Sequence, residues 1–300
     1  MTRNSLLLKK PLPKEAQAYF FVAPALLILL ILLVYPLFQV IRLSFFEVEA
    51  TRETFIGYTN YSQLMGDPIF FKALLQTCCF TLGSVLFHFV IGLGLALMLH
   101  QPLSHGVRNI FRGILIIPWL IAPTVAAMIW VLIYNPFGML NGLLISLGLM
   151  HQGVNLNWLG NPSFSLLSVT LVNIWRGFPF TMVMLLAALQ AIPEELYEAG
   201  MIDGATPLRS FFHITLPCLK GTVMTVGLLD TIWTFRHFDI IFAMTGGGPI
   251  NSSEVLTTHI YNLAFRSLRW GYASAEAVMM FLILLVFSLI YIQRVRKEEG

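Results

Sequence analysis

Long apolar runs separated by short polar connections dominate the chain. Six of these runs reach the roughly 20 residues that a helix needs to cross the hydrocarbon core of a membrane. They are residues 17–41, 73–99, 110–134, 164–189, 221–244 and 273–293. The first run is too long and too apolar for a signal-peptide core, so we interpret it as a retained span. The pattern predicts an all-α polytopic membrane protein with six transmembrane helices.

The composition supports this prediction and excludes other classes of protein. Apolar residues make up 57% of the chain, charged residues 11%, and the mean hydropathy is +0.78. A soluble domain carries about twice this charged fraction. The net charge of +3 indicates no nucleic-acid partner, and the three cysteines offer neither a disulfide framework nor metal-ligand spacing. We therefore expect one transmembrane domain over residues 1–300, without a metal site.

Lysine and arginine gather on one side of the predicted spans, as they do in cytoplasmic connections. Eleven lie on the side that holds both chain ends: Arg3, Lys9, Lys10, Lys14, Arg108, Arg112, Arg209, Lys220, Arg294, Arg296 and Lys297. Five lie on the opposite side: Arg42, Arg52, Lys72, Arg266 and Arg269. We expect both termini to be cytoplasmic and the connections 46–71 and 135–163 to be external. Within the second of these, the apolar stretch 140–150 predicts an interfacial or re-entrant helix.

The cytoplasmic connection over residues 190–217 has the most distinctive pattern of the chain. Pro193 suits a first helical position. Glu194 and Glu195 follow in the first turn, where the helix dipole favours negative charge. Asp203-Gly204 predicts a turn after this helix.

A second short helix is predicted after that turn. Thr206 is a suitable N-cap and Pro207 a suitable first residue. Its apolar side would carry Leu208, Phe211 and Phe212. Two short helices at a sharp angle between membrane spans form a rigid projection that fits a groove on another protein.

This connection resembles the cytoplasmic loop of ATP-binding-cassette (ABC) importer permeases, which reads E-A-A, three residues on D-G-A, then F-x-x-I-x-L-P. The matching residues are Glu198-Ala199-Gly200, Asp203-Gly204-Ala205, Phe211, Ile214, Leu216 and Pro217. Gly200 departs from the alanine that is usual in the family. The resemblance extends over residues 17–293, and blocks such as Asn173–Phe180 and Thr245–Pro249 are similar to the carbohydrate-importer branch.

The resemblance implies the type I ABC importer permease fold, and the first permease subunit of the maltose type. It implies import of a carbohydrate across a bacterial inner membrane, with a second permease subunit, an ATPase dimer and an extracytoplasmic sugar-binding protein as partners. The residues expected to contact the ATPase are Glu194, Glu195, Glu198, Ala199, Gly200, Asp203, Gly204, Ala205, Phe211, Leu216 and Pro217.

Motifs of enzymes are missing from the sequence. It contains no G-x-x-x-x-G-K-[ST], no H-E-x-x-H and no G-x-S-x-G. We therefore expect no catalytic residue and no cofactor in this chain, with ATP and magnesium bound by the separate ATPase.

Ionisable residues inside membrane spans are functional candidates, because a charge at mid-bilayer costs about 2.5–3.5 kcal/mol on insertion scales. On a wheel at about 100° per residue, Asp230, Trp233, Arg236 and His237 fall within an arc of roughly 120°. Such a face offers ring stacking and hydrogen bonds to a polyol. The candidates for the substrate path are Asn173, Arg176, Asp230, Trp233, Arg236, His237 and Asp239.

Structural roles for the same residues stay open. Arg176 could clamp helices together, Arg236 and Asp239 could neutralise each other, and Asp230 could serve packing or a gate. Glu276, near the outer end of the sixth span, is expected to reach water. If Arg176 and Arg236 both face the path, they favour an acidic sugar, because a guanidinium matches an oxyanion.

An ion-coupled secondary transporter of a small polar solute is the alternative function. It would also place ionisable residues inside the membrane, but it has no reason to display the 190–217 projection. Co-purification of an ATPase subunit discriminates the two classes.

Overall fold

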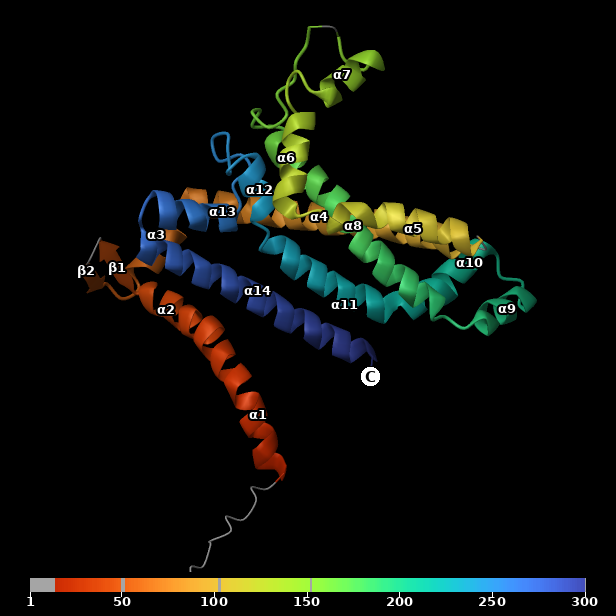
Figure 1. The fold of residues 1–300 in the computed structure, drawn as a ribbon, viewed down its shortest axis with the longest axis horizontal. Helices are drawn as coiled ribbons and strands as arrows, with labels where there is room; N and C mark the ends of the chain where they lie inside the picture. Colours follow the sequence, from red (N-terminus) through yellow and green to blue (C-terminus); the bar gives the residue numbers. More distant parts are fainter. Residues whose placement is uncertain (1–13, 50–51, 102–103, 152, 300) are drawn as a thin grey trace, which may run out of the picture.

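The computed structural model describes residues 14–49, 52–101, 104–151 and 153–299, which are mostly helical (Figure 1). The first half contains α1 (Lys14–Leu29), α2 (Tyr35–Leu43), β1 (Phe46–Glu49), β2 (Arg52–Phe55), α3 (Thr59–Met65), α4 (Pro68–His100), α5 (His105–Leu120), α6 (Pro123–Ile133) and α7 (Met139–Ser146). The second half contains α8 (Ser165–Gln190), α9 (Glu194–Ile202), α10 (Pro207–Ser210), α11 (Leu216–Phe235), α12 (Asp239–Met244), α13 (Leu256–Tyr261) and α14 (Trp270–Glu299). Three π-helical turns continue neighbouring helices: η1 (Leu30–Val34), η2 (Phe211–Thr215) and η3 (Asn262–Arg266).

Five helical stretches of the described chain are long and apolar enough to cross a membrane. They are Val22–Leu43, Pro68–His100, Ser165–Gln190, Pro207–Met244 and Trp270–Val295. They correspond to the first, second, fourth, fifth and sixth predicted spans.

The third predicted span, 110–134, is broken. Its two halves, Gly106–Leu120 and Pro123–Ile133, meet at 93°, and Figure 1 shows α6 leaving the bundle at an angle to α5. Ala122 is extended, with ψ 138°, because a proline disfavours the helical conformation of the residue before it. The six predicted spans are recovered when this bent pair counts as one span.

Helices α4 and α8 are packed against each other in the centre of the bundle, and α5 and α11 flank them (Figure 1). Small residues allow this close approach. A Cβ atom added to Gly92 of α4 would lie 3.0 Å from the backbone nitrogen of Met182 in α8. The core around this contact contains Ala96, Leu185 and Leu219.

The connections between spans form opposite ends of the bundle. The antiparallel hairpin β1–β2, in which Phe46 pairs with Phe55, lies with α3 at one end. Helix α9 lies at the other end, to which the C-terminal end of α14 also points (Figure 1). The first part of the stretch 140–150 lies in the short helix α7, which ends at Ser146 and lies beyond α6.

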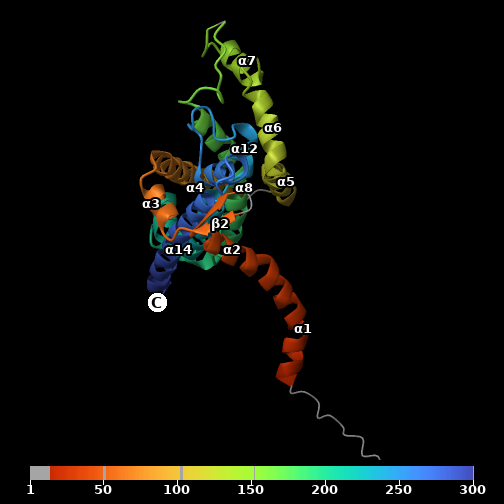
Figure 2. The ribbon, with the colours of Figure 1, turned by 90° about the vertical axis from the view of Figure 1, so that its left-hand side faces the viewer.

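The first span is the most exposed part of the described chain. None of the residues in its most apolar window is buried. Helix α2 packs against α14, whereas α1 diverges from the bundle (Figures 1 and 2). This apolar surface is available to lipid or to another subunit.

Candidate functional sites

The projection between α8 and α11 begins with α9. Glu194 and Glu195 form its first turn, as predicted. Pro193 is not the first helical residue but the N-cap, with φ −60° and ψ 133°. Its fixed φ suits both positions, and the sequence alone did not separate them.

The predicted turn after α9 is present and requires glycine. Gly204 has φ +75°, a conformation that costs other residues roughly 1–2 kcal/mol. The backbone N–H of Ala205 donates to the Gly200 carbonyl at 2.9 Å and closes the turn.

The predicted second short helix is not a separate element. The Thr206 hydroxyl does accept a hydrogen bond from the Arg209 N–H, but α10 continues through η2 into α11. Pro217 is accommodated in the first turn of α11, after the π-helical turn. The projection is therefore one short helix attached directly to the start of a span.

Side-chain contacts hold α9 against this extended helix. The hydroxyls of Tyr197 and Thr215 are 2.9 Å apart. A Cβ atom added to Gly200 would lie 3.0 Å from the Ile214 Cδ1 atom, so the unusual glycine permits close packing. These contacts make the projection a rigid extension of the fifth span.

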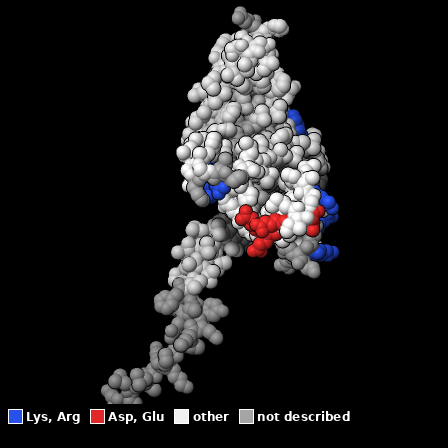
Figure 3. Space-filling model, turned by 90° about the vertical axis from the view of Figure 1, so that its right-hand side faces the viewer, with Lys and Arg blue, Asp and Glu red and all other residues white. Residues whose placement is uncertain are grey.

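The projection is acidic and partly apolar on its surface. Glu194, Glu195, Glu198 and Asp203 are exposed, and Figure 3 shows acidic side chains gathered on this end of the molecule. Exposed apolar side chains lie among them: Leu196, Met201, Ile202, Leu208 and Phe212. A groove of about 910 Å³ runs beside α9 and reaches His100 at the end of α4.

Asp230, a candidate for the substrate path, is buried between three helices. Its Oδ2 atom lies 2.9 Å from the His88 Nδ1 atom of α4. The His88 Nε2 atom lies 3.1 Å from the Asn173 carbonyl oxygen of α8. The His88 ring therefore bridges the Asp230 carboxyl group and the Asn173 backbone.

Close packing holds the His88 ring in the position from which it reaches both Asp230 and the Asn173 carbonyl. A Cβ atom at position 177 would lie 2.2 Å from the His88 Nε2 atom, so only glycine fits there. Asp230 and the Asn173 backbone therefore join α4, α8 and α11. The Asn173 side-chain nitrogen is buried and has no hydrogen-bond partner within the described chain.

Arg176 contacts the broken span. Its Nε–H donates at 3.1 Å to the carbonyl of Ile121, which lies two residues before Pro123. This carbonyl lies in the break between α5, which ends at Leu120, and α6, which begins at Pro123. Arg176 also interacts electrostatically with Asp239.

The helical wheel fails beyond Phe235, where α11 ends. Arg236 is the C-cap, His237 lies in the turn, and Asp239 begins α12. Of the roles left open for Arg236, its neutralisation by Asp239 is not observed: within the described chain no hydrogen bond or ion pair joins them, and Asp239 interacts electrostatically with Arg176. His237 stacks on Phe80 of α4, with 6.4 Å between ring centroids.

Trp233 belongs to an aromatic row that crosses three helices. Phe180 of α8 lies 5.2 Å from Trp233 and 6.0 Å from Trp119 of α5, between ring centroids. Trp119 is 40% exposed and Trp233 44%. The sequence analysis missed Trp119 and Phe180, because spacing within one span does not show which aromatic residues of other spans meet it.

The candidate sites thus separate into an acidic projection around α9 and an exposed aromatic row formed by Trp119, Phe180 and Trp233. Residues 88–296 match the family described as "Binding-protein-dependent transport system inner membrane component". The chain is 35% identical to the sulfoquinovosyl glycerol transport system permease protein SmoG of Agrobacterium fabrum, over 94% of this chain and 91% of that protein. It is 32% identical to the trehalose/maltose transport system permease protein MalF of Thermococcus litoralis, over 97% of each.

A solved structure has the same fold. It belongs to a bacterial ABC transporter involved in the import of the acidic polysaccharide alginate. The TM-score is 0.83 at 25% identity, and the match covers 94% of this chain and 96% of that one.

Proposed function

The chain belongs to the family of binding-protein-dependent transport system inner membrane components, and from this premise we propose that it carries a carbohydrate into the cytoplasm as one permease subunit of an ABC importer. It is a multi-pass membrane protein with the type I permease fold. The permease is not itself an enzyme, since ATP hydrolysis in such an importer is carried out by a separate ATPase subunit.

The observation that carries the proposal is the rigid attachment of α9 to the fifth span. Tyr197 and Gly200 pack on η2, which is continuous with α11. A partner that moves α9 therefore moves α11 with it, because force passes through packed contacts. We assign this role to an ATPase dimer that binds ATP and magnesium.

The aromatic row supports a carbohydrate as the substrate. The faces of Trp119, Phe180 and Trp233 suit sugar rings, which present apolar C–H groups above and below the ring. Two similar proteins are named for trehalose/maltose and sulfoquinovosyl glycerol. Carbohydrate transport by this chain is inferred from these features together.

An acidic carbohydrate is a more specific candidate, favoured by Arg236. This residue is exposed three positions after Trp233. Within the described chain its guanidinium makes no hydrogen bond and no ion pair, whereas Arg176 is engaged by Ile121 and Asp239. A free guanidinium suits a sugar that carries a carboxylate or sulfonate.

A second permease subunit completes the proposed path. The aromatic row is open on one side, and the first span is exposed along its length. A second subunit would cover both and enclose the path. The charge bias supports a cytoplasmic location of both termini and α9. On this orientation, an extracytoplasmic sugar-binding protein would meet the end that carries β1, β2 and α3.

The test is uptake into proteoliposomes that contain the chain with its co-purified partners. We expect uptake of a sugar to require both ATP at the α9 side and a binding protein at the other side. A panel of neutral sugars and their uronate counterparts identifies the substrate class. Uptake driven by an ion gradient, without a co-purified ATPase, would contradict the proposal and favour a secondary transporter.

A further inference from the structure

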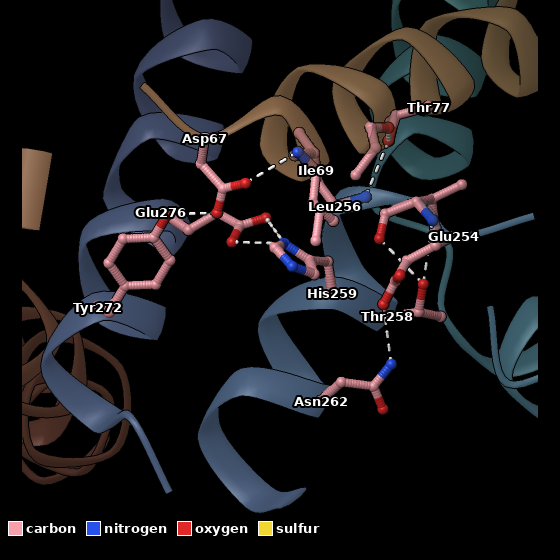
Figure 4. Close-up of polar contacts among 12 residues, drawn as sticks. Asp67, Ile69, Thr77, Glu254, Leu256, Thr258, His259, Asn262, Tyr272 and Glu276 are labelled. Atoms are coloured by element: carbon pink, nitrogen blue, oxygen red, sulfur yellow. Dashed lines mark hydrogen bonds and ion pairs between the residues drawn. The ribbon is translucent and has the colours of Figure 1, made fainter. Parts of the chain in front are cut away.

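A buried cluster of acidic residues surrounds one histidine at the end of the bundle opposite α9 (Figure 4). The acidic residues are Asp67 before α4, Glu254 before α13, and Glu276 of α14, and the histidine is His259 of α13. These residues belong neither to the projection that contains α9 nor to the aromatic row of Trp119, Phe180 and Trp233.

His259 and Glu276 form the centre of the cluster. The His259 Nδ1 atom lies 3.0 Å from one Glu276 carboxylate oxygen and 2.9 Å from the other. Glu276 is 0% exposed and His259 is 6% exposed. The sequence-based expectation that Glu276 reaches water is wrong, because α13 covers its side chain and supplies a partner.

The other two carboxylates attach neighbouring elements to the same cluster. Asp67 accepts a hydrogen bond from the Tyr272 hydroxyl at 2.7 Å and one from the Ile69 N–H at 2.8 Å. Glu254 accepts a hydrogen bond from the Asn262 amide at 2.9 Å. The hydrogen bond from Tyr272 joins the start of α4 to the start of α14, and the hydrogen bond from Asn262 joins the segment before α13 to η3.

A proton on His259 offsets part of the negative charge of the cluster. Asp67, Glu254 and Glu276 all act electrostatically on His259. The nearby Arg269 is directed to the Tyr272 ring, 4.2 Å from its centroid, and to Gln63. Buried carboxylates need compensation, and within the described chain His259 is the cation that supplies it to Glu276.

The environment favours the protonated ring. Burial alone would lower the pKa of His259, but the hydrogen bond and charge of Glu276, with the charges of Glu254 and Asp67, raise it above its ordinary value. A raised pKa means that the interaction is fully present below about pH 6.5. It is lost as the pH rises through the raised pKa.

Helix α13 also contacts the break between α11 and α12. The Thr257 hydroxyl donates to the His237 carbonyl at 2.8 Å. The Tyr261 ring lies 5.2 Å from Phe238 and 4.7 Å from Phe242, between centroids. A change in the position of α13 therefore reaches the turn that carries Arg236.

From these contacts we propose that His259 is a proton-dependent latch, which holds α13 against α14 and the start of α4 when its ring is protonated and releases it when the ring is neutral. Three carboxylates act on the ring: Glu276 from α14, Glu254 from the segment before α13, and Asp67 from the residue before α4. The Tyr272 hydroxyl of α14 is bonded to Asp67, and Arg269 lies over the Tyr272 ring. The proposal requires only that this end of the bundle is exposed to the external medium, and it does not depend on which substrate is carried.

The test compares thermal unfolding of the complex in nanodiscs between pH 6 and pH 8.5, for the wild type and for His259→Gln. Glutamine keeps a donor for Glu276 but does not titrate. We expect the wild-type Tm to fall by roughly 3 °C more than that of the variant over this interval. His151→Gln, which removes an exposed histidine, is the matched control and should retain the wild-type slope.

Hydrogen–deuterium exchange of the wild type provides a second measurement that does not need the variant to fold. After correction for intrinsic rates, exchange in peptides covering residues 254–262 should rise selectively above the raised pKa of His259, while peptides of α8 remain protected. Equal pH slopes of Tm for wild type and His259→Gln, or no selective rise in exchange over 254–262, would overturn the latch.

Discussion

Gly200 of α9 lies so close to Ile214 of η2 that any side chain at position 200 must displace the Ile214 methyl group, since a Cβ atom there would be 3.0 Å from it. Because η2 continues into α11, this contact sets the position of α9 relative to a membrane span. The contact gives a physical reason for the glycine that departs from the usual alanine.

Substitution of Gly200 tests this packing. Gly200→Ala should be tolerated, because the end of an isoleucine side chain can rotate away. Gly200→Val should displace α9 and reduce substrate-stimulated ATP hydrolysis several-fold, with the complex still assembled. Equal stimulation in both variants would mean that the position of α9 is not critical.

Gly204 provides a test of the turn itself. Its φ of +75° makes Gly204→Val costly by roughly 1–2 kcal/mol locally. Gly204→Asn is the matched control, since asparagine tolerates this conformation. We expect uptake to be lost in the valine variant and retained in the asparagine variant, measured at equal membrane levels of the protein.

The two arginines among the candidates for the substrate path should respond differently to substitution. Arg176→Gln removes a charged donor from the Ile121 carbonyl, a loss of about 1.5–3 kcal/mol, and should lower the Tm. Arg236→Gln breaks no contact in the described chain and should leave the Tm unchanged.

Transport by the Arg236→Gln variant then tests the acidic substrate. Uptake of an acidic sugar should fall at least about tenfold, while basal ATP hydrolysis is unchanged. Full uptake of an acidic substrate by this variant would refute the assignment of Arg236 to the substrate path.

Asp67 predicts a dependence on acidic pH with the opposite sign to that of His259. Burial alone would raise its pKa, but the hydrogen bonds from Tyr272 and the Ile69 N–H, with the charge of His259, lower it below the ordinary 3.8. Its stabilisation is therefore present above about pH 3.8 and is lost as the pH falls through the lowered pKa. Asp67→Asn should lower the Tm more at pH 6 than near pH 3, whereas the exposed Asp203→Asn should have little effect at either pH.

Much of the fold was predictable from apolar run lengths, because each span must satisfy its backbone inside a helix. The 93° bend before Pro123 could not be predicted in this way, because a count of apolar residues contains no information about the backbone conformation that each residue prefers. The end of α11 at Phe235 was missed for a related reason. A helical wheel assumes a continuous helix, so the predicted face containing Arg236 and His237 extended beyond the helix that carries Trp233.

The site residues also divide into those that the sequence predicts and those that only the packing of the spans brings together. The Glu194–Ala205 pattern predicted α9 and its turn, because caps and turns depend on neighbours in sequence. Contacts across helices, such as Phe180 with Trp233 and His259 with Glu276, depend on how the spans pack. Sequence spacing carries little information about that packing.

The most direct test of the central claim is ATP hydrolysis by the reconstituted complex, with and without its substrate-loaded binding protein, for the wild type, Glu198→Gln and Glu198→Lys. Glu198 is exposed on α9, so neither substitution disturbs the core. We predict that the wild type is stimulated, that the glutamine variant is stimulated less, and that the lysine variant remains at its basal rate although ATPase subunits co-purify with it. Stimulation of the lysine variant to the wild-type level would contradict the account, because α9 would then not transmit between the ATPase and the spans.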